Sequence, residues 1–196
     1  MMEMLCPRGC RTSEQELYAK VRAVFKSASS DYDKAAQSFF AMAQDKLHYA
    51  VLRQTAAQIR LGRADASKPN VGLTLMKADN PTTQELDVAK NFLTEGELQG
   101  LTNICEQFLL FAESKAFRGQ KMTMEELATK LNVLLMANDY PVLYEYNGYE
   151  RNKADQHVRS ELKIYRARLK EAEERKALEA GTGRYRGGGR DHAGRV

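Results

Sequence analysis

Residues 63–74 bring together side chains that could carry chemistry. The segment reads Arg-Ala-Asp-Ala-Ser-Lys-Pro-Asn-Val-Gly-Leu-Thr, so an acid, a hydroxyl, a base and an amide fall within six residues. A serine close to a lysine and an acid could support nucleophilic or acid–base chemistry. The candidate side chains of this loop are Arg63, Asp65, Ser67, Lys68 and Asn70.

Side chains elsewhere in the chain could complete such a site. Asp45 and His48 are three residues apart, a spacing at which a helical carboxylate can orient an imidazole. The alternative is structural, because Asp, Ser and Asn often bond to their own backbone in turns, and a histidine beside an apolar residue is typical of a core. The possible partners of the loop are His48, Asp87, Lys90 and Asn91.

The sequence predicts no resident metal and no cofactor. Cys6 and Cys10 form one cysteine pair, without the second pair or the nearby histidine that would supply four zinc ligands. The glycines at 187–189 have no predicted strand before them and no predicted helix after them, so they do not form a phosphate-binding loop. No serine lies in a nucleophile-elbow pattern.

The elements that must position these side chains are predicted to be helices. Apolar residues recur at helical spacing along most of the chain, which predicts an all-α fold, a compact multi-helix bundle. We expect one long helix to open at Asp31 and run to Ile59, and a short helix over 86–93. The apolar stripes of the core all lie before Tyr140. Capping-box pairs precede three of the stripes, namely Ser13 with Glu16, Thr94 with Glu97, and Thr123 with Glu126.

The C-terminal part of the chain has a different character. We predict a helical domain over 11–150, a long charged helix over 151–180 and a disordered Gly- and Arg-rich tail over 181–196. Residues 151–196 hold 13 Lys and Arg against 7 Asp and Glu, a net charge of +6, whereas the rest of the chain holds 17 against 19, a net charge of −2. This segment could therefore bind nucleic acid without sequence preference.

A seam of apolar residues follows a 4-3-4-3 spacing on the charged helix. It could pack back on the domain or mediate contact with a protein partner or a second copy, and the sequence leaves these alternatives open. The seam consists of Val158, Leu162, Tyr165, Leu169 and Ala172.

The sequence predicts a cytoplasmic protein without a membrane span. Its apolar runs are only a few residues long, too short to cross a bilayer. Residues 1–10 lack the apolar region of a signal peptide. Three cysteines do not make a disulfide framework, and this favours a reducing compartment.

Several strings of this sequence resemble the RhuM family of bacterial virulence-associated proteins. The resemblance is densest over 63–74 and covers about residues 11–138. The sequence departs from the family pattern at two places: Leu75-Met76 stands where a tryptophan is often found, and Gln58 stands where an acid is usual. The shorter strings are Arg11-Thr12-Ser13-Glu14, Phe39-Phe40, His48-Tyr49-Ala50, Thr55-Ala56-Ala57, the segment 87–93, and Met122-Thr123-Met124.

The resemblance implies a pathogenicity-island or mobile-element setting. It also implies a helical region that follows an N-terminal segment similar to helix-turn-helix DNA-binding modules. The ten residues ahead of Arg11 do not look like that segment. We therefore expect a non-enzymatic interaction module that normally accompanies a DNA-binding segment. The alternative is an enzyme of unknown reaction, with a polar site built from the Arg63–Thr74 loop and His48.

Overall fold

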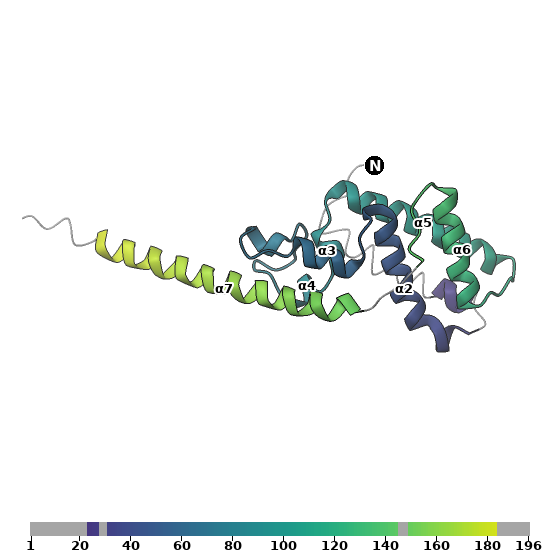
Figure 1. Cartoon of the computed structure of the whole chain (residues 1–196), viewed down its shortest axis with the longest axis horizontal. Helices are drawn as coiled ribbons and strands as arrows, with labels where there is room; N and C mark the ends of the chain where they lie inside the picture. The colour runs from purple at the N-terminus through teal and green to yellow at the C-terminus, as the bar shows by residue number, and fades with distance from the viewer. Residues whose placement is uncertain (1–22, 28–30, 145–148, 184–196) are drawn as a thin grey trace, which may run out of the picture.

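The computed structural model describes residues 23–27, 31–144 and 149–183. Its described elements are helices, which confirms the predicted all-α fold (Figure 1). A short helical stretch covers 23–27. The elements that follow are α2 (Tyr32–Leu52), α3 (Ala56–Arg63), η2 (Pro69–Gly72), α4 (Thr83–Leu86), η3 (Ala89–Phe92), α5 (Glu95–Phe117), α6 (Met124–Ala137) and α7 (Tyr149–Gly183), where η marks a 3₁₀ turn.

Capping boxes fix where several of the described helices begin. In each box a threonine side chain accepts a hydrogen bond from the third helical residue, whose side chain accepts one from the threonine backbone. Two of the boxes, at the starts of α5 and α6, confirm the sequence prediction, whereas the Ser13–Glu16 pair lies outside the described residues. The boxes are Thr55 with Gln58, Thr82 with Glu85, Thr94 with Glu97, and Thr123 with Glu126.

The predicted helix from Asp31 to Ile59 is in fact two helices. α2 ends at Leu52, Arg53 adopts a left-handed conformation with φ of 58°, and the capping box at Thr55 starts α3. The apolar stripe continues across this break, which is why spacing alone predicted one helix. The predicted helix over 86–93 is likewise divided, between α4 and η3.

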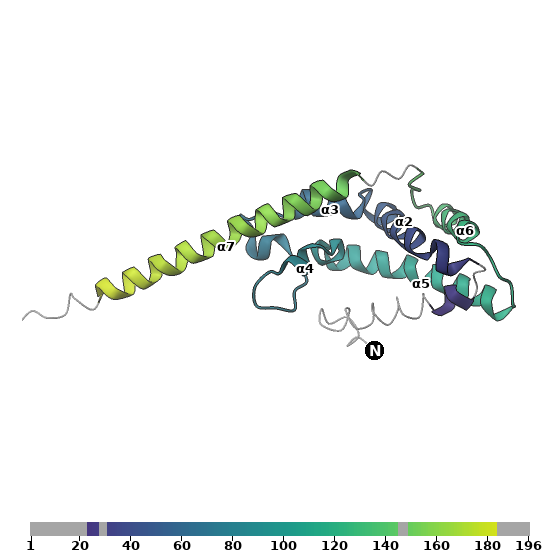
Figure 2. The same ribbon diagram turned by 90° about the horizontal axis from the view of Figure 1, so that it is seen from below.

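A first core lies where α2, α5 and α6 meet. Phenylalanine rings form its centre, with the Phe25 ring 5.4 Å from that of Phe39 and 5.6 Å from that of Phe108. Leu127, Leu131 and Leu135 of α6 fill the space beside them and are fully buried. Figure 2 shows α5 running beneath α2, so one face of each helix is covered by the other.

A second core joins α3, η3 and the loop 63–74 to α7. Val158 and Leu162 of α7 are 0% and 4% exposed, and they pack with Ile59, Val71 and Phe92. The prediction that all core stripes lie before Tyr140 is therefore wrong. These α7 residues are also the first part of the apolar seam, and the seam here packs on the chain's own body.

α7 continues well past the body that it packs on. Its 35 residues give a length of about 52 Å. Figure 1 shows the helix running along the body and then projecting from it, and residues 170–179 are all exposed. The helix reaches Gly183, beyond the predicted start of the tail at 181, and residues 184–196 lie outside the described part of the chain. None of the described helices is long and apolar enough to cross a bilayer.

Candidate functional site

The loop 63–74 folds on its own polar groups. The Asp65 carboxylate accepts hydrogen bonds from the Ser67 backbone N–H at 2.8 Å and the Ser67 hydroxyl at 2.6 Å. The Ser67 hydroxyl lowers the pKa of Asp65, and the backbone bond adds to this. The Lys68 ammonium lies 3.9 Å from the same carboxylate and is half exposed. These three side chains therefore form a surface turn of the kind that Asp and Ser commonly make.

The end of the loop is left-handed over three successive residues. The φ angles of Asn70, Val71 and Gly72 are 55°, 59° and 84°. Asn and Gly tolerate this region, whereas for β-branched valine it is a strained conformation that costs roughly 1–3 kcal/mol. Val71 is fully buried in the second core, and its carbonyl accepts a bond from the Asp65 N–H at 3.2 Å. Burial and this bond hold the strained turn in place.

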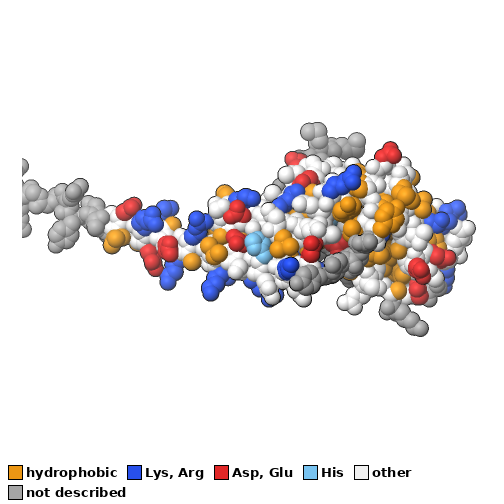
Figure 3. Space-filling view, in the orientation of Figure 1, with side chains coloured by type: hydrophobic (Ala, Val, Ile, Leu, Met, Phe, Trp, Pro, Cys, Tyr) orange, Lys and Arg blue, Asp and Glu red, His pale blue; other side chains and the backbone are white. Residues whose placement is uncertain are grey.

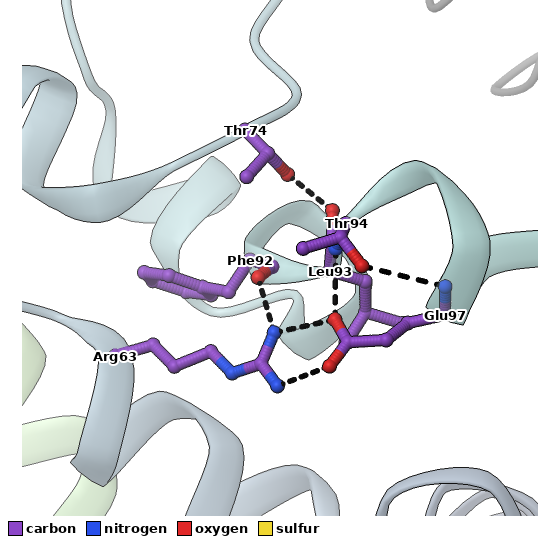
Figure 4. A network of polar contacts seen from close by, with 6 residues as sticks. All are labelled: Arg63, Thr74, Phe92, Leu93, Thr94 and Glu97. Atoms are coloured by element: carbon purple, nitrogen blue, oxygen red, sulfur yellow. Dashed lines mark hydrogen bonds and ion pairs between the residues drawn. The ribbon is translucent and has the colours of Figure 1, made fainter.

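Arg63 ties the start of the loop to the helices behind it. Its guanidinium donates two hydrogen bonds of 2.6 Å to the Glu97 carboxylate and one of 2.8 Å to the Phe92 carbonyl (Figure 4). The Arg63 guanidinium lowers the pKa of Glu97 to about 2, and the Glu97 carboxylate in turn raises the pKa of Arg63. The Thr74 hydroxyl closes the other end of the loop by donating to the Leu93 carbonyl at 2.6 Å. Both ends of the loop are therefore anchored near the start of α5.

α7 holds the middle of the loop through backbone groups. The Ala66 N–H donates to the Glu161 carboxylate at 2.6 Å, and Arg168 donates to the Ala66 carbonyl at 3.1 Å. The Asn70 N–H donates to the Tyr165 hydroxyl at 3.3 Å. His157 Nε2 lies 3.0 Å from the Ala64 carbonyl oxygen. Four backbone groups of the loop, at Ala64, Ala66 and Asn70, thus contact side chains of one helix.

Ion pairs attach the start of α7 to α2 and α3. The buried Arg60 guanidinium lies 2.7 Å from the Asp155 carboxylate and 3.6 Å from that of Asp87. Asp45 accepts a bond from the Ala56 N–H at 3.0 Å with one carboxylate oxygen and pairs with Arg151 at 3.1 Å through the other. The Asp45 carboxylate therefore caps α3 and binds α7, and it does not hydrogen-bond to His48.

The remaining predicted partners of the loop are buried in the body. His48 is 3% exposed, and its Nδ1 lies 2.7 Å from the Gln44 carbonyl of its own helix. Its Nε2 has no hydrogen-bond partner within the described part of the chain. Burial lowers the pKa of His48. Lys90 is buried, and the Asn91 side chain donates to the Glu85 carbonyl at 2.7 Å. Among the described residues, no hydrogen bond or ion pair joins His48 to the loop.

The described residues contain no group of three metal-ligating side chains. Cys6 and Cys10 lie outside those residues. Burial raises the pKa of the Cys105 thiol to about 12, which keeps it protonated. A thiol in that state is a poor nucleophile and a poor metal ligand.

A family model described as the virulence protein RhuM family matches residues 3–173. The chain belongs to the RhuM family. The match starts before and ends after the predicted limits of 11 and 138, so most of α7 falls within the RhuM region. No curated protein and no solved structure matches the chain.

One departure from the RhuM pattern has a structural explanation. Gln58, which stands where the resemblance led us to expect an acid, is part of the capping box of α3. Its side-chain oxygen accepts a bond from the Thr55 N–H at 3.0 Å, and its Nε2 donates to Glu150 at 3.3 Å. Glu and Gln serve equally in a capping box. Gln58 therefore has a capping role in this RhuM-family chain.

Several residues that build the site were not predicted. Glu85 is buried, and its carboxylate accepts bonds from the Lys77 N–H at 2.7 Å and the Thr82 hydroxyl at 3.0 Å, which shapes the loop before α4. The Thr82–Glu85 capping-box spacing could have indicated it. Other contacts join residues that are far apart in the sequence, and no local sequence pattern indicates them. They are made by Arg60, Glu161 and Arg168.

The pair Arg63–Glu97 should be strongly coupled. In a double-mutant cycle with Arg63→Met and Glu97→Gln, we expect a coupling free energy of about 1–2 kcal/mol, because the bond is bidentate and charge-assisted. Since the pKa of Glu97 is about 2 in the folded chain against an ordinary 4.5, this stabilisation should be present above pH 4.5 and lost as the pH falls towards 2. Urea denaturation of the four variants measures both effects.

The exposed pair Lys170–Glu174, with nitrogen and oxygen 3.7 Å apart, is the control for this cycle. Its coupling should be close to zero, because solvent screens exposed pairs. Equal coupling at the two pairs would contradict the assigned role of Arg63.

Proposed function

We propose that this RhuM-family chain is a non-enzymatic interaction module that normally accompanies a DNA-binding segment. We also propose that it binds nucleic acid without sequence preference through residues 151–196. The observation that supports this most is the use of the polar loop groups in holding α7, through the contacts of Ala66 with Glu161 and Arg168. In this proposal the role of the loop is to hold α7 in a fixed orientation on the body, so that the basic side chains of the helix face a partner.

The enzyme alternative has less support. An enzyme of the predicted kind needs its acid, base and nucleophile within reach of one another in a concave pocket. His48 bonds to its own helix, Arg63 to Glu97, and the Asp65 carboxylate to Ser67. Each of these candidate groups is therefore bonded to a different partner. Of the loop candidates, Asn70 bonds to α7, through its backbone N–H and the Tyr165 hydroxyl.

The charge distribution supports a polyanionic partner. Residues 151–196 carry a net charge of +6, while the rest of the chain carries −2. Basic side chains that neutralise phosphates release condensed counterions, and this release drives non-specific binding. Val158 and Leu162 of the apolar seam are buried in the second core, so these two residues are not available for self-association. The setting that we propose is the bacterial cytoplasm, with a gene carried on a mobile element.

Salt-dependent binding by the full chain tests this proposal. We expect fluorescence anisotropy to show equal, weak affinity for two duplexes of unrelated sequence, falling as salt rises with a log–log slope of roughly −0.9 for each phosphate contacted. Absence of binding at low salt would refute the nucleic-acid part and favour a protein partner. A chain that ends at Glu150 is unsuitable for this test, because it lacks Val158 and Leu162 and so leaves the second core incomplete.

A further inference from the structure

The geometry points to one face of α7 as the docking line for the phosphate backbone of a nucleic acid. We call the side chains of Arg159, Lys163, Arg166 and Lys170 the basic stripe. This inference rests on the proposed function and narrows it from the segment 151–196 to four residues. It assigns the binding to the basic stripe and not to the arginines at 184–196, which also contribute to the net charge of +6 of residues 151–196.

The sequence spacing places the basic stripe on one side of the helix. Steps of four, three and four residues keep the side chains within about 60° of arc over roughly 16 Å of helix length. All four residues are exposed. No acidic residue occurs in 162–170. The stripe therefore carries no acidic residue between Lys163 and Lys170. Figure 3 shows Lys and Arg side chains, with Asp and Glu side chains among them, along α7.

Contacts with the body fix which way the stripe faces. Val158 and Leu162 are buried in the second core, and Tyr165 bonds to the Asn70 backbone, so α7 cannot turn about its axis. Glu161, which lies between Arg159 and Lys163 in the sequence, is directed to the Ala66 N–H at 2.6 Å. The fold thereby turns a negative charge inward and leaves the basic stripe outward. A preformed line of charge loses little conformational entropy on binding.

The four basic groups are available to a ligand. Within the described residues, Arg159 and Lys163 make no ion pair. The one hydrogen bond that Arg166 donates to a described residue is a long one, of 3.4 Å, to the Pro81 carbonyl. Lys170 pairs with Glu174 at 3.7 Å, and both side chains are more than half exposed, so this pair is weak. An incoming phosphate would therefore displace little.

An open cavity of about 270 Å³ lies beside the stripe. Asn80 and Pro81 line one side of it, and Tyr165, Arg166 and Lys170 line the other, with Glu173 also in the lining. The cavity offers room for a phosphodiester group between the two cationic side chains. Its size and openness suit a segment of an extended backbone that continues along the helix.

The chemistry favours a nucleic acid over other anionic partners. A basic amphipathic helix anchors on a membrane through a continuous apolar face that enters the lipid. In α7 the apolar residues Val158 and Leu162 are buried in the second core, which leaves no such continuous face beside the stripe. A nucleic acid presents regularly spaced phosphates along a line, which matches basic groups that repeat along a straight helix. An acidic protein segment is the competing possibility, and the experiment separates the two.

The test compares two full-length variants with equal loss of charge. The stripe variant carries Arg159→Gln, Lys163→Gln, Arg166→Gln and Lys170→Gln. The tail variant carries the same change at the four arginines of the C-terminal end, Arg184, Arg186, Arg190 and Arg195. We expect the stripe variant to bind duplex DNA at least about tenfold more weakly at low salt, with a log–log salt slope flatter by about 3 to 4. The tail variant should keep most of its affinity.

Each outcome decides the inference. If the tail variant loses binding and the stripe variant keeps it, the inference fails while the proposed function stands. If the wild-type chain does not bind, both fail. If polyglutamate displaces the chain as well as duplex DNA does at equal charge concentration, the assignment to a phosphate backbone fails. If the stripe variant unfolds at a lower temperature than the wild type, the single substitution Lys163→Glu takes its place. It should flatten the log–log salt slope by at least about 0.9. An unchanged slope would overturn the inference.

Discussion

Replacing Val158 by aspartate should cost at least about 3 kcal/mol of unfolding free energy, the largest effect that we expect from a single change in this chain. Val158 is 0% exposed and packs in the second core, so the new carboxylate would be buried without a partner. Such a loss is a large fraction of the stability of an ordinary domain. Urea denaturation measures it, and hydrogen exchange should become fast at Ala66 and Asn70, whose N–H groups bond to α7.

The matched control is Ile164→Asp on the same helix. Ile164 is 48% exposed, so its carboxylate would remain in water and the cost should stay within about 1 kcal/mol. Similar losses at the two positions would show that α7 is not packed on the body through the face that carries Val158.

Gly72→Ala should destabilise the chain by about 2–4 kcal/mol. Gly72 has φ of 84°, where an L side chain is strained, and a Cβ atom there would overlap the Arg63 carbonyl oxygen. Because that oxygen belongs to the backbone at the end of α3, the loop and the helix would have to separate. The midpoint of thermal unfolding reports the loss, and a midpoint equal to that of the wild type would contradict the left-handed turn.

Gly62→Ala is the control, and the expected change has the opposite sign. Gly62 lies within α3, and a Cβ atom there would meet nothing within 4 Å. The substitution should stabilise the chain by about 0.5–1 kcal/mol, because alanine loses less conformational entropy than glycine in a helix.

Local features of the fold were predictable because their causes lie within a few residues. The Thr94–Glu97 and Thr123–Glu126 spacings place the starts of α5 and α6 correctly, since a capping box is a short-range hydrogen-bond pattern. Asp31 was expected to open α2, and it does precede that helix. Its side chain, however, accepts a bond from the Met124 N–H at 2.9 Å and so serves α6, a contact that depends on the tertiary fold.

The candidate site was predictable in its location but not in its contacts. The turn formed by Asp65 and Ser67 follows from residues that bond to their own backbone. The partners on α7 lie far along the chain, as the 95 residues between Ala66 and Glu161 illustrate. Spacing patterns describe one helix at a time, so they could not indicate that the charged helix completes the core around the loop.

The long separation between the loop and α7 has a consequence for the order of folding. A nascent chain emerges from its N-terminus, so α2, α5 and α6 are all synthesised before Val158 and Leu162, which the second core needs. The first core can assemble during synthesis, while the strained turn at Val71 must wait for the last helix. A product of premature termination before α7 would therefore expose apolar surface around Ile59 and Phe92. Such a partly folded chain would be susceptible to proteolysis.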